Sequence, residues 1–419
     1  MKSSKTKKGK IINEKTMIAA LDIGKGAHYA YFRAPNGKDI KPFFFHNVKK
    51  GFDTFWMKLC QFKRKEGLEG TVIGFESTGP YAEPLLHYLR RKPVILVQIN
   101  PVHSKRLKEL TGNSPNKTDT KDPRVIADII SLGHALTLVV PEGSAAQLRR
   151  LTQARERAIR SRTAMVNQLH HLLFVIFPEF FKVFKDISTK SALYVIKNHP
   201  TPESITSVGL ESLTVMVRKV SRGKLTHGRI KELFKAAQQS IGIDEGKESI
   251  LMEMEHLVSA MDHESRFIDD LEKQMSYHLD HIPYSHCILS IKGIALITVA
   301  GLIGEVGDFK KFHTISEMMK LAGLDLFEIS SGKHRGKRRI SKRGRSLMRK
   351  LLYFAAINVV KSHGIMHEQY QEMLNRGMVK MKALVAISRK LLMLIFALAR
   401  DNTVYVENYS NIHHLKLAA

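Results

Sequence analysis

The sequence predicts an α/β domain in the N-terminal part of the chain, followed by long helices and then by a mostly helical region. Three observations support this fold class. Short apolar runs alternate with helix-period segments over about residues 16–140, which is typical of a layered α/β domain. From Ser144 onward, apolar residues recur at three- and four-residue spacing over long stretches. Between about residues 283 and 400 the helical period continues, interrupted by a Ser-Gly loop.

The N-terminal region contains apolar runs that we interpret as strands, with turn residues between them. These runs are Met17–Leu21, Tyr29–Phe32, Phe43–Phe45, Thr71–Phe75 and Pro93–Val97. Helical spacing predicts helices over Gly51–Lys65 and Tyr81–Arg91. Pro123 suits the first turn of a further helix that continues through Val125–Ile130. Strands that alternate with helices in this way indicate a layered sheet that includes parallel strands.

Two long helices are predicted in the middle of the chain, from about Ser144 to Pro178 and from about Glu248 to Leu279. In the second helix the heptad a and d positions are apolar apart from Glu264, and they hold Ile250, Met254, Leu257, Met261, Ile268, Leu271 and Met275. An antiparallel coiled-coil arm, a dimer interface and a helix buried in a bundle all fit, because neither helix has about four clean heptads. Residues 181–247 between the helices are mixed and basic, and we assign them no chemistry.

The C-terminal region begins with a glycine turn. Ser290–Ile294 leads into an apolar helix over Ala295–Val306, and Gly307-Asp308 then breaks the chain. This pattern resembles a helix–hairpin–helix, in which backbone N–H groups contact a DNA phosphate. Helix pairs separated by glycine are also common in protein cores, so both interpretations stay open.

The charge of the chain indicates the class of its partner. Its 419 residues include 67 Lys and Arg against 39 Asp and Glu, a formal net charge of +28. Such a surplus favours nucleic acid as the partner, and an anionic membrane surface second, because binding to a polyanion releases counterions. We expect residues 1–16 to be a basic disordered arm. The two cysteines, Cys60 and Cys287, are far apart, and no apolar stretch is long enough to cross a membrane, so we expect a soluble cytoplasmic protein.

A set of carboxylates follows the predicted strands and begins the helix at Pro123. The set consists of Asp22, Glu76, Asp119 and Asp122. Neighbouring strand ends can bring the first two together, and the spacing of the last two places them on one side of a helical turn. Because carboxylates in one pocket repel each other, the set favours Mg²⁺ ligation, and two ions about 3.5–4 Å apart would assist in-line phosphoryl transfer. The competing interpretation of Asp119 and Asp122 is a solvated helix N-terminus.

A second candidate site is the loop Ser330-Ser331-Gly332, which precedes a run of ten cations without an acid. The run comprises Lys333, Arg335, Lys337, Arg338, Arg339, Lys342, Arg343, Arg345, Arg349 and Lys350. Phosphate binding is the natural function of such a run. Guanidinium groups near a serine would stabilise its alkoxide and a pentavalent phosphoryl transition state. From residue chemistry alone, a flexible connecting loop is the simpler interpretation, since Ser-Gly loops are common.

Several motifs occur in a recognisable order. The acidic motifs are Leu21–Lys25, Phe75–Gly79 and Lys117–Asp122. The C-terminal motifs are Ile291–Ile294, Leu321–Leu324, Ser331-Gly332 and Ile340–Gly344. In this order and separation they resemble the motifs of the DEDD transposases of the insertion-sequence-110 family, which also includes the Piv-type DNA invertases. The resemblance covers most of the chain outside the basic arm, residues 181–247 and the tail.

The resemblance implies a fold and a set of domains. It implies a RuvC-like, ribonuclease-H-type domain, then a helical coiled-coil connector with an insert, then a mostly α-helical transposase domain with the serine loop, and a tail. The corresponding ranges are 17–143, 144–282 with the insert 181–247, 283–400 and 401–419. It also implies a DNA recombinase that excises and inserts a mobile element.

The resemblance further implies the chemistry and the partners. Asp22, Glu76, Asp119 and Asp122 would bind Mg²⁺, and Ser331, with Ser330 as the alternative, would attack the phosphodiester to form a phosphoserine link. Family members act on the DNA of element ends and targets, which a non-coding bridge RNA selects. They assemble as homodimers and homotetramers in which different protomers contribute the acidic and serine sites.

Other functions are compatible with parts of the sequence. A sugar-kinase or actin-like ATPase would need a second Asp-x-Gly turn and a Gly-rich adenosine site, and we find neither. A RuvC-like nuclease or Holliday junction resolvase would use metal-activated water, so Ser331→Ala should leave it active. A non-catalytic nucleic-acid-binding protein would tolerate Asp22→Asn in any DNA-processing assay.

Overall fold

The structure is a computed structural model in which residues 12–76, 79–111, 122–328, 336 and 338–407 are described. The chain divides into two compact units, with the boundary between Val139 and Val140. Each unit buries hydrophobic clusters of its own.

The first unit is built around a six-stranded sheet in the order β3-β2-β1-β4-β5-β6. The strands are β1 (Thr16–Ile23), β2 (Ala27–Arg33), β3 (Phe43–His46), β4 (Gly70–Glu76), β5 (Ile95–Ile99) and β6 (Leu136–Thr137). β2 is antiparallel to both β1 and β3, β1 and β5 are parallel to β4, and β6 is antiparallel to β5. The sequence predictions of the first five strands are confirmed, with β5 two residues further along, whereas β6 was not predicted.

Helices cover both faces of this sheet, which explains why its central strands are almost continuously apolar. On one face Leu21 of β1 belongs to a cluster with Phe55 of α1, and on the other face Ala20 belongs to a cluster with Ile126 of α4. The helices of the unit are α1 (Lys49–Lys65), α2 (Glu83–Leu89, after the 3-10 turn Gly79–Ala82), α3 (Pro101–Thr111) and α4 (Asp122–Ser131).

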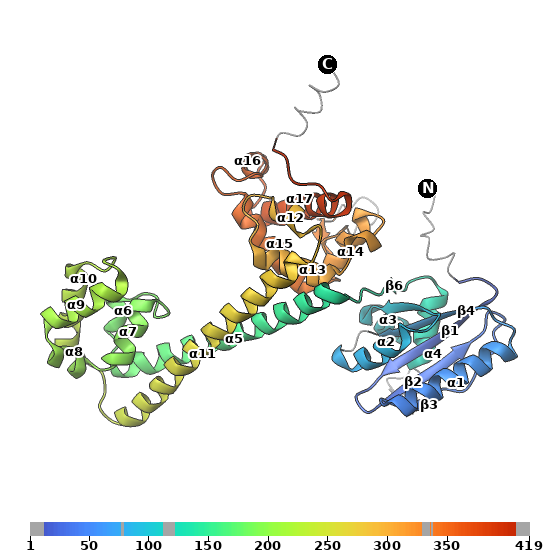
Figure 1. Cartoon of the computed structure of the whole chain (residues 1–419), viewed down its shortest axis with the longest axis horizontal. Helices are drawn as coiled ribbons and strands as arrows, with labels where there is room; N and C mark the ends of the chain where they lie inside the picture. Colours follow the sequence, from blue (N-terminus) through green and yellow to red (C-terminus); the bar gives the residue numbers. More distant parts are fainter. Residues whose placement is uncertain (1–11, 77–78, 112–121, 329–335, 337, 408–419) are drawn as a thin grey trace, which may run out of the picture. The chain divides into compact units, whose positions relative to one another are not determined.

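The second unit contains two long helices that lie side by side, α5 (Gly143–Ile176) and α11 (Lys247–Asp280) (Figure 1). They are antiparallel, because Arg155 Nε donates to Glu272 Oε1 at 2.7 Å, whereas Ile176 at the other end of α5 shares a cluster with Met254. The predicted a and d residues of α11 are buried from Met254 to Met275, apart from the polar break at Glu264. The periodicity of the second helix thus identified its packing face.

Residues 177–246 form a group of short helices at one end of this pair (Figure 1). The helices are α6 (Phe180–Val183), α7 (Lys190–Asn198), α8 (Pro202–Val208), α9 (Leu210–Ser221) and α10 (His227–Gln238). Their apolar side chains and those of the adjoining ends of α5 and α11 make one hydrophobic cluster. We call this group the tip module.

The C-terminal part of the second unit is a helical body with a short hairpin. Its elements are α12 (Ser285–Leu289), α13 (Leu296–Val306), the 3-10 turn Phe309–Lys311, α14 (Ile315–Ala322), β7 (Leu326–Phe327), β8 (Arg339–Ile340), α15 (Ser346–Val359), α16 (His367–Asn375) and α17 (Lys380–Asp401). The predicted glycine turn lies between α12 and α13, with Gly293 at φ +93°. Two glycines let α13 approach its neighbours, since a Cβ on Gly304 would lie 2.7 Å from the Arg149 backbone N of α5 and one on Gly301 would lie 2.4 Å from Leu351 Cδ1.

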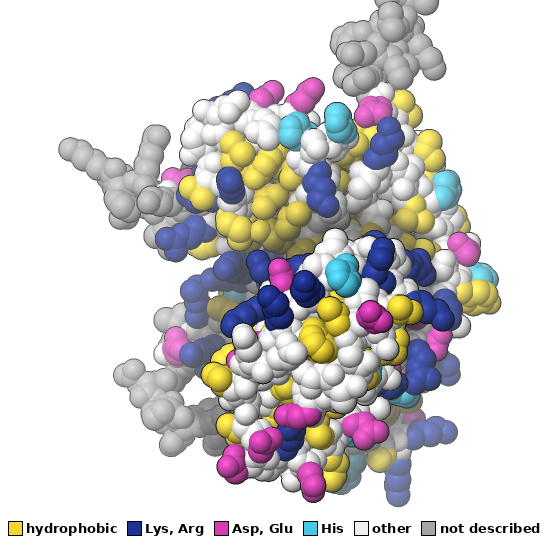
Figure 2. All heavy atoms as spheres, turned by 90° about the vertical axis from the view of Figure 1, so that its left-hand side faces the viewer, with side chains coloured by type: hydrophobic (Ala, Val, Ile, Leu, Met, Phe, Trp, Pro, Cys, Tyr) yellow, Lys and Arg dark blue, Asp and Glu magenta, His cyan; other side chains and the backbone are white. Residues whose placement is uncertain are grey.

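Charge is distributed unevenly over the surface. Figure 2 shows many Lys and Arg side chains on the face drawn, with Asp and Glu side chains interspersed and a group of them at the lower end of the part nearest the viewer. Among the residues that the structure describes, every helix is too short or too polar to cross a membrane.

Candidate active site

Asp22 and Glu76 lie at the carboxyl ends of two neighbouring parallel strands, β1 and β4. The register pairs Leu21 with Phe75, so the next residues, Asp22 and Glu76, stand at the same level one strand apart. Alternate residues of a strand share a face. Ala20 and Gly74, two residues earlier, both face α4: Ala20 shares a cluster with α4, and a Cβ on Gly74 would lie 2.4 Å from the Ile130 side chain. The fold therefore brings both half-buried carboxylates to the α4 face of the sheet.

Helix α4, which begins with Asp122, packs on the face of the sheet toward which Asp22 and Glu76 are directed. Arg33 of β2, which pairs in register with Ile18 near the start of β1, bonds through Nη1 to Asp128 Oδ1 at 2.5 Å. Asp128 of α4 therefore lies near β2, while Ile130 of the same helix packs against Gly74 of β4. Asp122 is the first residue of α4. Three of the four predicted carboxylates thus come from β1, β4 and α4, and α4 covers the sheet face toward which Asp22 and Glu76 are directed.

A cation that the sequence analysis missed contacts this group. Lys108 Nζ of α3 lies 2.7 Å from Asp122 Oδ2, and the Asp122 side chain is only 14% exposed. By contrast, the Glu76 carboxylate makes no hydrogen bond or ion pair with the rest of the described chain, although its backbone belongs to the β4–β5 ladder. No local pattern in the sequence marks Lys108, because the contact depends on how α3 packs beside α4.

The carboxylates of Asp22, Glu76 and Asp122 are suited by their chemistry to bind a hard divalent cation. Carboxylate oxygens are the ligands that Mg²⁺ prefers, and two like charges at adjacent strand ends favour a cation between them. Among the described residues, no three His, Cys, Asp or Glu side chains already lie close enough to hold a metal ion, and Asp122 is paired with Lys108. Asp119 lies outside the described residues, so the prediction for it stays a prediction.

The basic run divides into side chains that stabilise the fold and side chains that face solvent. Arg345 Nη1 contacts Glu305 Oε2 at 3.1 Å and the Glu305 carbonyl at 2.8 Å, so we assign this predicted phosphate ligand a structural role. Lys350 Nζ lies 2.5 Å from Glu156 Oε2 of α5. Arg349 donates to the backbone carbonyls of Ala322 and Gly344, and Arg338 pairs with Glu328. The side chains that face solvent are those of Arg339, Lys342 and Arg343. The predicted contacts Lys333, Arg335 and Lys337 lie outside the described residues.

The segment around the predicted serine nucleophile has an anchored base. Ser330 and Ser331 lie outside the described residues, but the strands on either side of them, β7 and β8, pair with each other. Behind β8, Lys342 N donates to the Gly323 carbonyl at 3.0 Å, and the hydroxyl of Ser341 bonds to the Asp325 carboxylate. A Cβ on Gly344 would lie 2.4 Å from Gly323 N. The motifs Leu321–Leu324 and Ile340–Gly344 are therefore neighbours in the fold. Each has a glycine at their contact, because a side chain there would collide with the backbone of the other motif.

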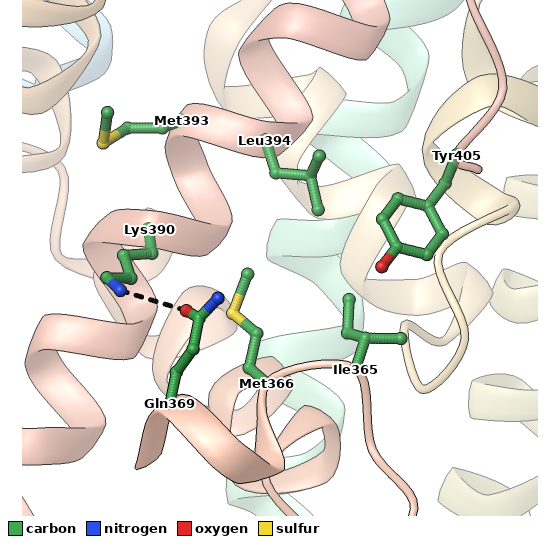
Figure 3. A pocket seen from close by; sticks show the side chains of 7 residues that line it. All are labelled: Ile365, Met366, Gln369, Lys390, Met393, Leu394 and Tyr405. Atoms are coloured by element: carbon green, nitrogen blue, oxygen red, sulfur yellow. Dashed lines mark hydrogen bonds between the residues drawn. The ribbon is translucent and has the colours of Figure 1, made fainter. Parts of the chain in front are cut away.

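A hollow of about 320 Å³ lies in the C-terminal body, between α16, α17 and the segment that follows α17 (Figure 3). Its lining is mostly apolar, and its polar groups are Lys390, which bonds to Gln369 at 3.0 Å, and the Tyr405 hydroxyl. The lining holds no carboxylate and no nucleophile beside a base. The hollow is therefore not a candidate for phosphoryl-transfer chemistry.

The chain matches two family models in the regions that carry these features. Residues 19–178 match the model of the DEDD transposase of insertion sequence IS110. Residues 285–371 match the model described as the transposase of the IS116/IS110/IS902 family. Together the two matches span more than half of the chain.

Curated relatives resemble the chain over most of its length. It is 24% identical over 395 residues to the "Insertion element IS110 uncharacterized 43.6 kDa protein" of Streptomyces coelicolor, covering 93% of this chain and 95% of that protein. It is 23% identical to the "Insertion element IS116 uncharacterized 44.8 kDa protein" of Streptomyces clavuligerus, covering 75% and 82%. It is 25% identical to the "Insertion element IS900 uncharacterized 42 kDa protein" of Mycobacterium paratuberculosis, covering 69% and 73%.

Proposed function

This chain belongs to the IS110/IS116/IS902 family of transposases, and we propose that it cuts and rejoins DNA strands at the ends of a mobile element and at its target. The observation that carries the proposal is that Asp22 and Glu76 stand at one level on adjacent parallel strands, on the face of the sheet that α4 covers. Acting on DNA also suits the formal net charge of +28. We place this activity in the cytoplasm, where the cell's DNA is accessible.

We assign a RuvC-like, ribonuclease-H-type fold to residues 17–143. The strand order β3-β2-β1-β4-β5, antiparallel among the first three strands and parallel from β1 to β5, supports this assignment. We assign residues 144–282 to the connector and 283–400 to the transposase domain.

We propose that Asp22, Glu76, Asp119 and Asp122 hold Mg²⁺, which when bound would polarise the scissile phosphate. Lys108 would then have to leave Asp122, because its ammonium group and the metal ion compete for the same carboxylate. Released from Asp122, Lys108 would be available to a phosphate oxygen of the DNA.

We propose Ser331 as the nucleophile and Ser330 as the alternative. The Ser331 hydroxyl would lose its proton to water and form a bond to phosphorus, while the bond from phosphorus to the 3′ oxygen breaks and that oxygen takes up a proton. A 3′ hydroxyl of the partner duplex would then attack the phosphoserine and release the serine. The pairing of β7 with β8 supports a defined position for the loop base, and exposed Arg339, Lys342 and Arg343 lie next to it. They would hold DNA or RNA phosphates together with Lys333, Arg335, Lys337 and Arg338.

Denaturing gels of the protein incubated with its element ends and Mg²⁺ test this proposal. Wild type and the matched control Ser330→Ala should form a covalent protein–DNA adduct, and Ser331→Ala and Asp22→Asn should not. An adduct that still forms in Ser331→Ala would show that another residue is the nucleophile. Strand cutting by Ser331→Ala without an adduct in any variant would favour hydrolysis by metal-activated water.

We further propose a bridge RNA and a homodimer or homotetramer as the working assembly, in which one protomer supplies the acidic site and another the serine loop. The cationic surplus supports the binding of RNA as well as DNA. Mixing Asp22→Asn with Ser331→Ala protomers tests the shared site, since complementation should restore activity only if the two sites act across protomers. Sequencing of RNA that purifies with the protein tests the guide.

A further inference from the structure

The tip module lies between the two regions that match the family models, which are residues 19–178 and 285–371. It is nevertheless a well-packed part of the molecule, since Val195, Leu213 and Leu233 are completely buried. Its last segment is fixed to α5, because Ile243 N donates to the Val175 carbonyl at 3.2 Å. A packed module of this kind holds any side chains on its surface in defined positions.

The surface charges of the tip module are segregated. Carboxylates gather where the module joins α11, and Lys247 bonds there to Glu203 at 2.8 Å and to Asp244 at 2.9 Å. The last turn of α9 and the turn that follows it carry exposed cations instead, namely Arg218, Lys219, Arg222 and Lys224. Within the described part of the chain, no carboxylate lies in ion-pairing distance of these four side chains. Cations that the protein leaves unpaired are free to bind an external anion.

The backbone of this turn is held in an unusual conformation. Arg222 has φ +54° and Gly223 has φ +75°. Left-handed geometry is unfavourable for a side chain such as arginine, and glycine or asparagine is the usual residue there. Hydrogen bonds hold the turn, from Gly223 N to the Arg218 carbonyl at 2.9 Å and from Leu225 N to Ser221 Oγ at 3.3 Å. Within the described residues the Arg222 side chain makes no hydrogen bond or ion pair that would explain an arginine at this position, which favours a role toward a ligand.

The cationic surface continues onto a neighbouring helix. Arg229, three residues into α10, donates through Nη2 to the Val183 carbonyl at 2.9 Å, which joins the start of α10 to the end of α6. Exposed Lys182 and Lys185 flank that carbonyl in the sequence. Exposed cations thus lie on or next to α6 and α9, with Arg229 of α10, which also pairs with Glu232 at 3.4 Å, between α6 and α10. Several separate cations suit an extended polyanion better than a single small anion.

From these observations we infer that the α9–α10 turn of the tip module binds the phosphate backbone of a nucleic acid. The inference extends the proposed function, but it rests only on nucleic-acid binding and not on strand cleavage. A nucleic acid is favoured over an anionic membrane, because surface-lying membrane helices insert Trp, Phe or Leu. Beside these cations, Val215 is the exposed large apolar residue of α9.

The test compares two double variants of the full-length protein that remove equal charge. Arg222→Gly with Lys224→Ala alters the turn, and Lys231→Ala with Lys235→Ala alters the solvent face of α10. Binding to a short fluorescent DNA duplex and to an RNA hairpin is measured by anisotropy between about 50 and 200 mM salt. Each phosphate contact contributes about 0.9 to the salt slope, so losing two contacts should reduce the fall in affinity over this range by about 10-fold.

We expect the turn variant to show this reduced salt dependence and the α10 variant to retain the wild-type value. The arm with the larger change identifies DNA or RNA as the bound polymer. Equal losses in both variants, wild-type binding by the turn variant, or a loss only on vesicles of anionic lipid would overturn the inference. The anisotropy measurement needs no strand cleavage, so a failed cleavage proposal and a failed tip contact give different results.

Discussion

Replacing Arg345 with alanine would leave a buried carboxylate without its partner. The side chains of Arg345 and Glu305 are 19% and 7% exposed, and the guanidinium contacts both the Glu305 carboxylate and its carbonyl. Breaking a buried ion pair by removing one partner costs about 3–5 kcal/mol. Because Arg345 retains some exposure, we expect a loss of about 3 kcal/mol in the free energy of unfolding.

Thermal unfolding followed by circular dichroism measures this loss. For a unit of this size each kcal/mol corresponds to about 2 °C, so the melting temperature of Arg345→Ala should fall by about 6 °C. Adding Glu305→Gln to Arg345→Ala should restore part of the stability, since the unpaired charge is then removed. Arg345→Lys should lose less than alanine, because lysine keeps the charge but cannot reproduce both contacts.

The matched control is Arg343→Ala, which removes an exposed cation two residues away. It should leave the melting temperature unchanged and, if Arg343 binds a phosphate, reduce the salt slope of DNA binding by about one. The reasoning would be refuted if Arg345→Ala melted like wild type and reduced the salt slope instead. Arg345 would then be a phosphate ligand and not a structural residue.

Three further predictions concern the candidate active site, the contact of α13 with α5, and the buried side chain of His28. Asp22→Asn should reduce DNA cleavage more than about 100-fold, because it removes a proposed Mg²⁺ ligand. Cleavage at the wild-type rate on denaturing gels would contradict this. Gly304→Val should destabilise the second unit by about 2–3 kcal/mol, because its Cβ would collide with the α5 backbone. The control is Gly223→Val, which strains the backbone at an exposed turn without meeting any neighbouring atom, and so separates the cost of backbone strain from the cost of crowding. Burial lowers the pKa of His28, so the folded state favours the neutral imidazole. The free energy of unfolding should therefore fall as the pH drops below about 6.5, where His28 of the unfolded chain binds a proton. His28→Phe should remove this pH dependence, and an acid-unfolding curve identical to that of wild type would refute the prediction.

The hydrophobic period predicted the elements of both units because it reflects which face each element buries. The apolar run Thr71–Phe75 became β4, and the a and d residues of α11 from Met254 to Met275 are buried, Glu264 apart. Elements with few apolar contacts were missed. The strands β6, β7 and β8 have two residues each, too few to show alternation.

The candidate site was predictable in part. Carboxylates after two apolar runs indicated Asp22 and Glu76, and their register then follows from β1 and β4 being parallel neighbours. Lys108 escaped prediction because it meets Asp122 only when α3 and α4 pack together. The division of the basic run escaped it for the same reason, since Lys350 pairs with Glu156, far away on α5.

The sequence by itself determined the strands and helices with a strong hydrophobic period, the cationic character and the order of the acidic motifs, because propensity, charge and spacing are properties of neighbouring residues. Only the tertiary structure decided which charges are neutralised within the fold and which remain for a ligand. Arg345 and Arg222 are equally cationic in the sequence, yet one is paired with a buried glutamate while the other stands on an exposed turn. Coulomb energies depend on distance and burial, and both are set by residues that are remote along the chain.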